Sequence, residues 1–157
     1  LPDPRQEGSG NPGATNVLRF GGKKLAAIVM LGDALKGLVP VLIARVFHVE
    51  GFALSLVAMT AVLGHMYPLF FRFQGGKGVA TILGAIFGLS WLVGILVLLT
   101  WGLIAKIFRY SSLASLCSII LLPIYLAIFS PLHKEVLKVE FQALEVKLRS
   151  PDHQSER

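Results

Sequence analysis

Apolar residues along this chain gather in long runs that short polar segments separate. Windows wide enough for a bilayer find apolar stretches at residues 24–47, 52–71, 79–87, 91–108 and 113–129. The third stretch is too short to cross alone, because a spanning helix needs about 20 residues. The pattern therefore predicts an all-α, polytopic integral membrane helix bundle in which polar, glycine-rich loops join apolar helices.

The short third stretch leaves two arrangements open. Gly84, Gly88 and the break at 88–90 fit a half-helix that lines a cavity, or the first part of one kinked span that continues to Phe108. Small residues within the apolar runs permit close contact between helices, and helix packing is the role we expect for them. These residues are Gly32, Gly37, Gly84, Gly88 and Gly94.

Composition supports a membrane protein, since 54% of the residues are hydrophobic, 15% are charged and the mean hydropathy is +0.69. The net charge of +6 would suit nucleic-acid binding, but the basic residues stand in short segments between apolar runs. We therefore expect no nucleic-acid partner. The single cysteine, Cys117, is expected to be a small buried or lipid-facing residue.

Basic residues predict the orientation in the membrane, because cytoplasmic loops carry an excess of lysine and arginine. They flank two glycine-rich segments, as Arg5, Arg19, Lys23 and Lys24 around the first and as Arg72 and Lys77 around the second. The connection after the first span is mixed, with Arg45, His48 and Glu50. Both glycine-rich loops are therefore expected to face the cytoplasm, and two intervening spans would return them to one side.

The second glycine-rich segment has the properties of an anion site. Gly75, Gly76 and Gly78 expose main-chain N–H groups, Lys77 adds a positive charge, and a helix is expected to begin near Val79. The segment is no Walker A loop, because that motif needs glycine at position 71 and a hydroxyl residue at position 78. Phosphate is the expected ligand, and a plain turn with a snorkelling lysine is the alternative.

The first segment, residues 8–19, gathers flexible backbone and many hydrogen-bonding side chains. These residues are Gly8, Ser9, Gly10, Asn11, Gly13, Thr15 and Asn16, and Arg19 follows them. A helix cap would explain only one or two of them. Arginine can hold an oxyanion through two N–H groups, so we expect a binding or catalytic loop.

Three ionisable residues stand inside predicted spans. Asp33 and Lys36 are spaced to share one helix face. Two interpretations are open: the two residues form an ion pair with each other, or one of them reaches a polar cavity shared with the two loops. His65 precedes Pro68, which would end or bend its helix near the second loop. Two alternatives are open for His65: a structural residue whose ring is hydrogen-bonded within the protein, or a functional residue of the site.

Together these residues resemble the first two signature motifs of the bacterial acyl-phosphate:glycerol-3-phosphate acyltransferase family (PlsY). The matching segments are residues 8–19 and Gly64-His65 with residues 73–81; Asp33-x-x-Lys36-Gly37 and Tyr110-Ser111-Ser112-Leu113 also match. Gln74 stands where lysine is common in the family. The resemblance extends from Leu1 to about Pro131.

The resemblance implies transfer of a fatty acyl group from acyl phosphate to the 1-hydroxyl of glycerol 3-phosphate, at the bacterial plasma (inner) membrane. It implies catalytic roles for Ser9, Asn11, Arg19 and His65, and substrate binding by Gly10, Gly13, Thr15, Asn16, Lys36, Gly75, Gly76, Lys77 and Gly78. Membrane lipids and an enzyme that forms acyl phosphate are the further partners, and no metal or other cofactor is expected. Two acceptors are open for the proton of the attacking hydroxyl: a group of the protein or a phosphate oxygen of the substrate.

Other glycerolipid acyltransferases use His-x-x-x-x-Asp, and none of the four histidines here has aspartate five positions later. That mechanism is excluded. The alternative function is a noncatalytic phosphate- or lipid-binding membrane protein, a transporter-like remnant or an inactive fragment of the family.

Composition changes after Pro131, so we expect a membrane domain at 1–131 and a polar tail at 132–157. Leu137, Phe141, Leu144 and Leu148 have the spacing of an amphipathic helix on the membrane or the protein. No third family motif with histidine and asparagine is found there, so a truncation, a frameshift or a divergent extension is expected. The start at Leu1 also leads us to expect a preceding segment.

Overall fold

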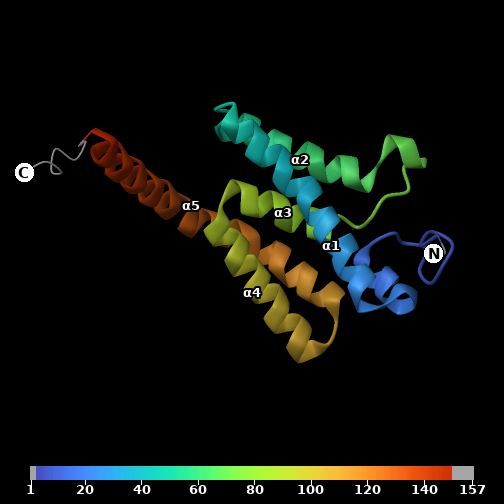
Figure 1. The fold of residues 1–157 in the computed structure, drawn as a ribbon. Helices are drawn as coiled ribbons and strands as arrows, with labels where there is room; N and C mark the ends of the chain where they lie inside the picture. Colours follow the sequence, from blue (N-terminus) through green and yellow to red (C-terminus); the bar gives the residue numbers. More distant parts are fainter. Residues whose placement is uncertain (1–2, 150–157) are drawn as a thin grey trace, which may run out of the picture.

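The structure, a computed structural model, describes residues 3–149; beyond Phe129 it describes side chains only at residues 138, 139 and 142–147. The described chain consists of helices and loops without strands (Figure 1). The elements are α1 (Ala14–Val46), α2 (Gly51–Met66), the short 3₁₀ helix η1 (Leu69–Phe71), α3 (Val79–Leu89), α4 (Trp91–Phe108) and α5 (Ser111–Arg149). The predicted all-α membrane bundle is confirmed.

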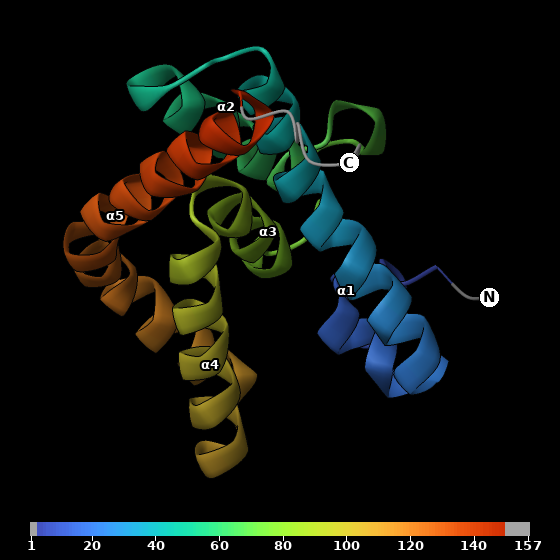
Figure 2. The same cartoon turned by 60° about the vertical axis from the view of Figure 1, so that its left-hand side comes forward.

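Four described regions are long and apolar enough to cross a membrane: Ala14–Val46, Gly51–Phe71, Trp91–Phe108 and Ser111–Phe129. They match the predicted spans, and Val79–Leu89 is a shorter apolar helix in addition to these four. Within α1, Gly22 has φ 77° and ψ 175°, a conformation that glycine adopts readily. This kink separates a short helical piece at 14–21 from the long span, so the span begins close to residue 24, as predicted (Figure 2).

The open question about residues 79–108 has a clear answer, because α3 and α4 are two helices that meet at Ser90. Ser90 is extended, with φ −158° and ψ 108°, and its hydroxyl accepts a hydrogen bond from the Val93 N–H at 3.5 Å. A Cβ on Gly94 would lie 2.7 Å from the Phe87 ring, so the two helices pack closely beside the junction. Of the two arrangements left open by the sequence, the single kinked span is therefore excluded, since an extended N-cap residue starts a new helix.

Helix α3 lies at the centre of the bundle, between α1 and α2 on one side and α4 and α5 on the other (Figure 2). One core cluster joins α1, α2 and α3 and consists of Val41, Ala44, Leu54, Ala58 and Ala85. The other joins α3 and α4 and consists of Ile86, Val93 and Val97, with Leu122, Tyr125, Leu126 and Phe129 of α5 packed against it. Both halves of the bundle therefore depend on α3.

Glycines allow α1 and α3 to approach each other. A Cβ on Gly37 would collide with the Thr81 carbonyl oxygen, and one on Gly84 with the Ala34 carbonyl oxygen. A Cβ on Gly88 would lie 2.8 Å from Val41. These contacts confirm the packing role for Gly37, Gly84 and Gly88, as the Phe87 contact does for Gly94. The same expectation was wrong for Gly32, whose Cβ position has no atom within 4 Å and which lines a cavity instead.

Helix α5 packs along α4 and then continues beyond the bundle (Figure 1). Hydrogen bonds join the two helices between Thr100 Oγ1 and Tyr125 OH at 2.8 Å, and from Trp101 Nε1 to Ser115 Oγ at 3.1 Å. The helix has no break at Pro131, so the boundary between residues 131 and 132 stays a prediction from composition. Of the predicted apolar stripe, Leu144 is exposed, and the side chains of Leu137, Phe141 and Leu148 lie outside the described residues.

Candidate functional site

A cavity of about 470 Å³, lined by both charged and apolar residues, lies where the N-terminal segment, α1, α2 and the connection to α3 meet. Its lining comes from both glycine-rich regions and from two membrane spans. The lining residues are Arg5, Pro12, Val29, Gly32, Asp33, Lys36, Ala61, Gly64, His65, Pro68, Phe71, Gln74, Gly75 and Gly76. The cavity therefore unites groups that lie far apart along the sequence.

The chain turns sharply after α2, and this turn brings the second glycine-rich segment to the cavity. Residues before a proline avoid the helical conformation, so α2 ends at Met66, shortly before Pro68. Beyond η1, Arg72 and Phe73 adopt left-handed conformations, with φ 52° and 61°. As predicted, Pro68 therefore coincides with the end of the helix that carries His65.

Glycine is needed at positions 75 and 76 because the backbone there lies against the end of α2. A Cβ on Gly75 would collide with the His65 and Met66 carbonyl oxygens, and one on Gly76 would collide with His65 Nε2. Gly78, with φ 79°, is the N-cap of α3. The glycines thus fit the segment against His65 and start the next helix.

The second glycine-rich segment lies beside the middle of α1. The first turn of α3 packs on Gly37, which is about 20 Å along the helix from Lys23 at 1.5 Å per residue. The segment just before α3 therefore reaches the level of Asp33 and Lys36. Irregular backbone at such depth is tolerated where it lines a cavity, as it does here.

Asp33 connects the other two ionisable residues of the cavity. Lys36 Nζ donates a hydrogen bond to Asp33 Oδ1 at 2.9 Å, and His65 Nδ1 lies 3.5 Å from the same oxygen. Asp33 is buried, whereas the Lys36 side chain is 62% exposed. The predicted ion pair and the predicted cavity position of Lys36 are therefore both present. Pairing offsets the cost of a buried carboxylate in an apolar span.

The first glycine-rich loop is held together by Asn16, which is 3% exposed. Its Oδ1 accepts a hydrogen bond from the Ser9 N–H at 2.9 Å, and its Nδ2 donates to the Pro4 and Glu7 carbonyls at 3.0 and 2.9 Å. Asn11 Oδ1 accepts from the Gly13 N–H at 2.9 Å. In this arrangement the Asn16 side chain is occupied by its own loop, which it shapes.

Of the predicted site residues, the cavity lining includes Lys36, His65, Gly75 and Gly76. The residues that do not line it are Ser9, Gly10, Asn11, Gly13, Thr15, Asn16, Arg19, Lys77 and Gly78. Ser9, Thr15, Arg19 and Lys77 are exposed at the protein surface. Their roles stay predictions.

Sequence reasoning missed Arg5 as part of the site. It gave Asp33 as one of two residues that could reach a shared cavity and Gln74 as a change near a phosphate contact, but included neither among the site residues, and both line the cavity. Arg5 was counted only as an orientation charge, although it stands three residues before Gly8. The contact that reveals it is with Phe71, whose ring centroid lies 4.4 Å from the guanidinium carbon. Among the described residues, no group of three or more His, Cys, Asp or Glu side chains could hold a metal ion.

A second, apolar groove of about 260 Å³ lies between α2 and α3. It is lined by Ala58, Met59, Val62, Leu63, Ile82, Ala85, Ile86 and Leu89. Every lining residue is apolar and belongs to the membrane span α2 or to the shorter apolar helix α3. The groove is therefore chemically suited to a hydrocarbon chain.

Comparison with known proteins gives consistent matches to one family. Residues 1–149 match the family described as Glycerol-3-phosphate acyltransferase, so the match continues beyond Pro131, the expected end of the resemblance. A glycerol-3-phosphate acyltransferase of Coxiella burnetii (strain RSA 493 / Nine Mile phase I) is 56% identical over 125 residues, which are 80% of this chain and 65% of the relative. One of Legionella pneumophila (strain Paris) is 53% identical over 139 residues, 84% of this chain and 50% of the relative. The chain thus spans 50% to 65% of the length of these curated relatives.

Solved structures agree with these sequence matches. A crystal structure of PlsY (YgiH), an integral membrane glycerol 3-phosphate acyltransferase, in its glycerol 3-phosphate form is 46% identical with a TM-score of 0.76, over 81% of this chain and 64% of that one. The lysophosphatidic acid form of PlsY (YgiH) has a TM-score of 0.71 and 46% identity, over 76% of this chain and 62% of that one. The predicted family is confirmed: this chain belongs to the glycerol-3-phosphate acyltransferase family.

Proposed function

We propose that this chain transfers a fatty acyl group from acyl phosphate to the 1-hydroxyl of glycerol 3-phosphate, forming lysophosphatidic acid and inorganic phosphate. The observation that carries the proposal is the cavity of about 470 Å³, in which both glycine-rich regions meet Asp33, Lys36 and His65 inside a membrane bundle. Family membership supports it, as do related structures named for their glycerol 3-phosphate and lysophosphatidic acid forms.

The chemistry requires little covalent help from the protein, because an acyl phosphate is already activated. The substrate hydroxyl oxygen bonds to the carbonyl carbon, and the bond from that carbon to the phosphate oxygen breaks. Phosphate leaves with the electron pair, and the hydroxyl proton passes to His65 or to a phosphate oxygen. The protein must align the two substrates and offset negative charge, for which Lys36 and the N–H groups at Gly75 and Gly76 are available.

Two phosphate groups must come together in this reaction, so the site extends beyond the cavity lining. In this proposal Ser9, Asn11 and Arg19 act in catalysis from the first loop, and Lys77 binds phosphate from the second. The side chains of Ser9, Arg19 and Lys77 are exposed, and their loops adjoin the cavity at Pro12 and Gly76. Gly10, Gly13, Thr15, Asn16 and Gly78 complete the proposed substrate-binding set by shaping these loops.

The acyl chain is proposed to enter sideways from the bilayer into the apolar groove between α2 and α3. The groove shares α2 with the cavity, since Ala58, Met59, Val62 and Leu63 line the groove while Ala61, Gly64 and His65 line the cavity. A donor could thus keep its hydrocarbon chain in lipid-like surroundings while its phosphate reaches polar groups. No water-filled tunnel for the chain is needed.

The proposed location is the bacterial inner membrane, with the glycine-rich loops in the cytoplasm, where glycerol 3-phosphate is available. An enzyme that forms acyl phosphate would deliver the donor on that side. The support is the excess of basic residues at the loop end of the bundle.

The activity can be tested with the purified chain in lipid, radiolabelled glycerol 3-phosphate and palmitoyl phosphate. We expect labelled lysophosphatidate with palmitoyl phosphate and none with palmitoyl coenzyme A. His65→Ala and Arg19→Ala should lower the rate by about a hundredfold or more, the low end of what a lost acid–base or charge-stabilising group costs. No product above the Arg19→Ala control would reject catalysis by this chain, and product from palmitoyl coenzyme A would overturn the proposed donor.

A noncatalytic phosphate- or lipid-binding membrane protein is the second candidate. It is favoured by the exposure of Ser9 and Arg19 outside the cavity. Binding of labelled glycerol 3-phosphate without any acyl transfer would support this candidate over the first.

A further inference from the structure

We propose that Arg5 binds a substrate phosphate in the cavity and that Phe71 holds the Arg5 guanidinium in position for this. The inference deepens the proposed function and rests on it. Arg5 lies outside the two glycine-rich motifs whose residues are expected to bind substrate or act in catalysis. Three observations support its role: its uncompensated charge, its packing on Phe71 and its position in the cavity lining.

Charge compensation distinguishes Arg5 from the other cation of the cavity. The charged lining residues are Arg5, Asp33 and Lys36. Lys36 is compensated by Asp33 at 2.9 Å, and His65 faces the same carboxylate. Among the described side chains, Arg5 forms no ion pair, and its guanidinium makes no hydrogen bond. The net positive charge of the cavity therefore resides on Arg5.

An unsatisfied donor supports the same conclusion. Arg5 Nε is buried and has no hydrogen-bond partner among the described residues. Burying part of a guanidinium without an acceptor is unfavourable, because its N–H groups lose water without gaining a partner. An arriving anion would remove this penalty, so the arrangement favours binding of negative charge.

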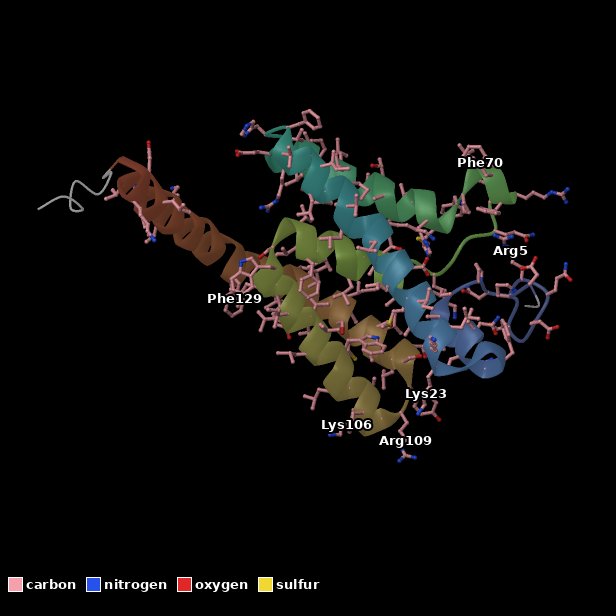
Figure 3. All side chains as sticks on the ribbon, viewed as in Figure 1. Arg5, Lys23, Phe70, Lys106, Arg109 and Phe129 are labelled. Carbon is pink, nitrogen blue, oxygen red and sulfur yellow. The ribbon has the colours of Figure 1, made fainter. Side chains whose placement is uncertain are left out.

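Packing explains how the cation keeps its position without a carboxylate. The guanidinium carbon lies 4.4 Å from the centroid of the Phe71 ring, within the range of a cation–π contact. Both residues line the cavity, and Arg5 lies on the N-terminal segment where it faces the segment that carries Phe70 (Figure 3). An aromatic face orients the group but leaves its charge and its N–H donors available, whereas an acidic partner would consume both.

Phosphate is the ligand class that fits this arrangement. The planar fork of arginine can donate two parallel hydrogen bonds to phosphate oxygens. Glycerol 3-phosphate and acyl phosphate both carry such a group. The kinetic test must therefore separate the two sources.

The test measures the KM for each substrate in turn, with Arg5→Gln, Arg5→Lys, Phe71→Leu and Phe71→Tyr. A charge-assisted hydrogen bond contributes enough that Arg5→Gln should raise one KM by about tenfold or more. Arg5→Lys should have an intermediate effect, because it retains the charge but loses the fork. Phe71→Leu should raise the same KM by about threefold, and Phe71→Tyr, which keeps an aromatic face, should not. The substrate whose KM rises is the one that Arg5 binds.

Arg72→Gln is the matched control, because Arg72 is an exposed arginine next to Phe71 that does not line the cavity. It should leave both KM values within about twofold of wild type, since an exposed charge in water interacts weakly. Equal effects of Arg72→Gln and Arg5→Gln would overturn the proposal in favour of general surface charge. A fall in kcat alone, or unchanged KM values in Arg5→Gln, would also overturn it.

A failure of the proposed function would look different, because wild type itself would form no product. Equilibrium dialysis with labelled glycerol 3-phosphate and with labelled palmitoyl phosphate then tests Arg5 directly. Weaker binding of either ligand by Arg5→Gln and Arg5→Lys, with an unchanged elution volume in detergent, would support the inference. Unchanged binding of both ligands by Arg5→Gln and Arg5→Lys would overturn the inference.

Discussion

At the scale of single residues, the site depends on two buried side chains that each serve several partners. Asp33 faces both Lys36 and His65, and Asn16 binds three main-chain groups of the first loop. Removing such a shared group leaves several polar partners unsatisfied at once, which costs more than the loss of one isolated hydrogen bond. These two residues should therefore be sensitive to substitution even where they do not touch substrate.

Asn16→Ala should loosen the first loop. It removes three hydrogen bonds, each contributing about 1 kcal/mol, so the free energy of local opening should fall by about 2 to 3 kcal/mol. Hydrogen–deuterium exchange of residues 4–13 in the detergent-solubilised protein measures this change. Asn11→Ala is the control, because it removes only the bond from the Gly13 N–H and should cost about 1 kcal/mol. Equal exchange in the two variants would show that Asn16 does not anchor the loop.

At the scale of elements, α3 connects the two halves of the bundle and positions the second glycine-rich segment. Its contacts with α1 are made backbone to backbone, at Gly37 and Gly84. Close approach of this kind leaves no space for an added methyl group, because a carbonyl oxygen cannot rotate away as a side chain can. The position of residues 75–78 beside Asp33 thus depends on small residues some distance along the chain.

Gly84→Ala should destabilise the protein, because its methyl group would collide with the Ala34 carbonyl. Overpacking of this kind costs about 1 to 3 kcal/mol and should lower the thermal unfolding temperature in detergent. Gly102→Ala in α4 is the control, since nothing lies within 4 Å of its Cβ position. Higher helix propensity should make that change neutral or stabilising by up to about 1 kcal/mol. Effects of the same sign in both variants would contradict the packing account.

At the scale of the whole molecule, charge is distributed unevenly between the two ends of the bundle. The end with the first glycine-rich loop carries Arg5, Arg19, Lys23, Lys24 and Arg72, together with Lys106 and Arg109 near the α4–α5 turn (Figure 3). The α1–α2 turn at the opposite end carries Arg45, His48 and Glu50. Because basic loops stay in the cytoplasm, this asymmetry predicts the orientation.

Thiol labelling of whole cells can test this orientation. In a Cys117→Ser background, Gln6→Cys and Glu50→Cys each place one exposed thiol at opposite ends of the bundle. A membrane-impermeant maleimide with access to the outer face of the membrane should label Glu50→Cys in intact cells. It should label Gln6→Cys only after the membrane is permeabilised. Labelling in the reverse order would overturn the predicted orientation.

Several features followed from local pattern alone. The apolar runs specified the spans, since burial in lipid depends on composition and length. Pro68 specified the end of α2, and the motif residues around Gly8 and Gly75 identified the family. Each of these rests on interactions between near neighbours in the chain or between the chain and its solvent.

Other features were decided only by the tertiary structure. Whether residues 79–108 form one helix or two depended on the extended conformation of Ser90 and on Phe87 packing against Gly94. The cavity position of Arg5 depended on the turn that brings Phe71 to it. Sequence reasoning lists the available charges, but pairing between distant residues determines which remain uncompensated, because electrostatic energy depends on distances that only the fold sets.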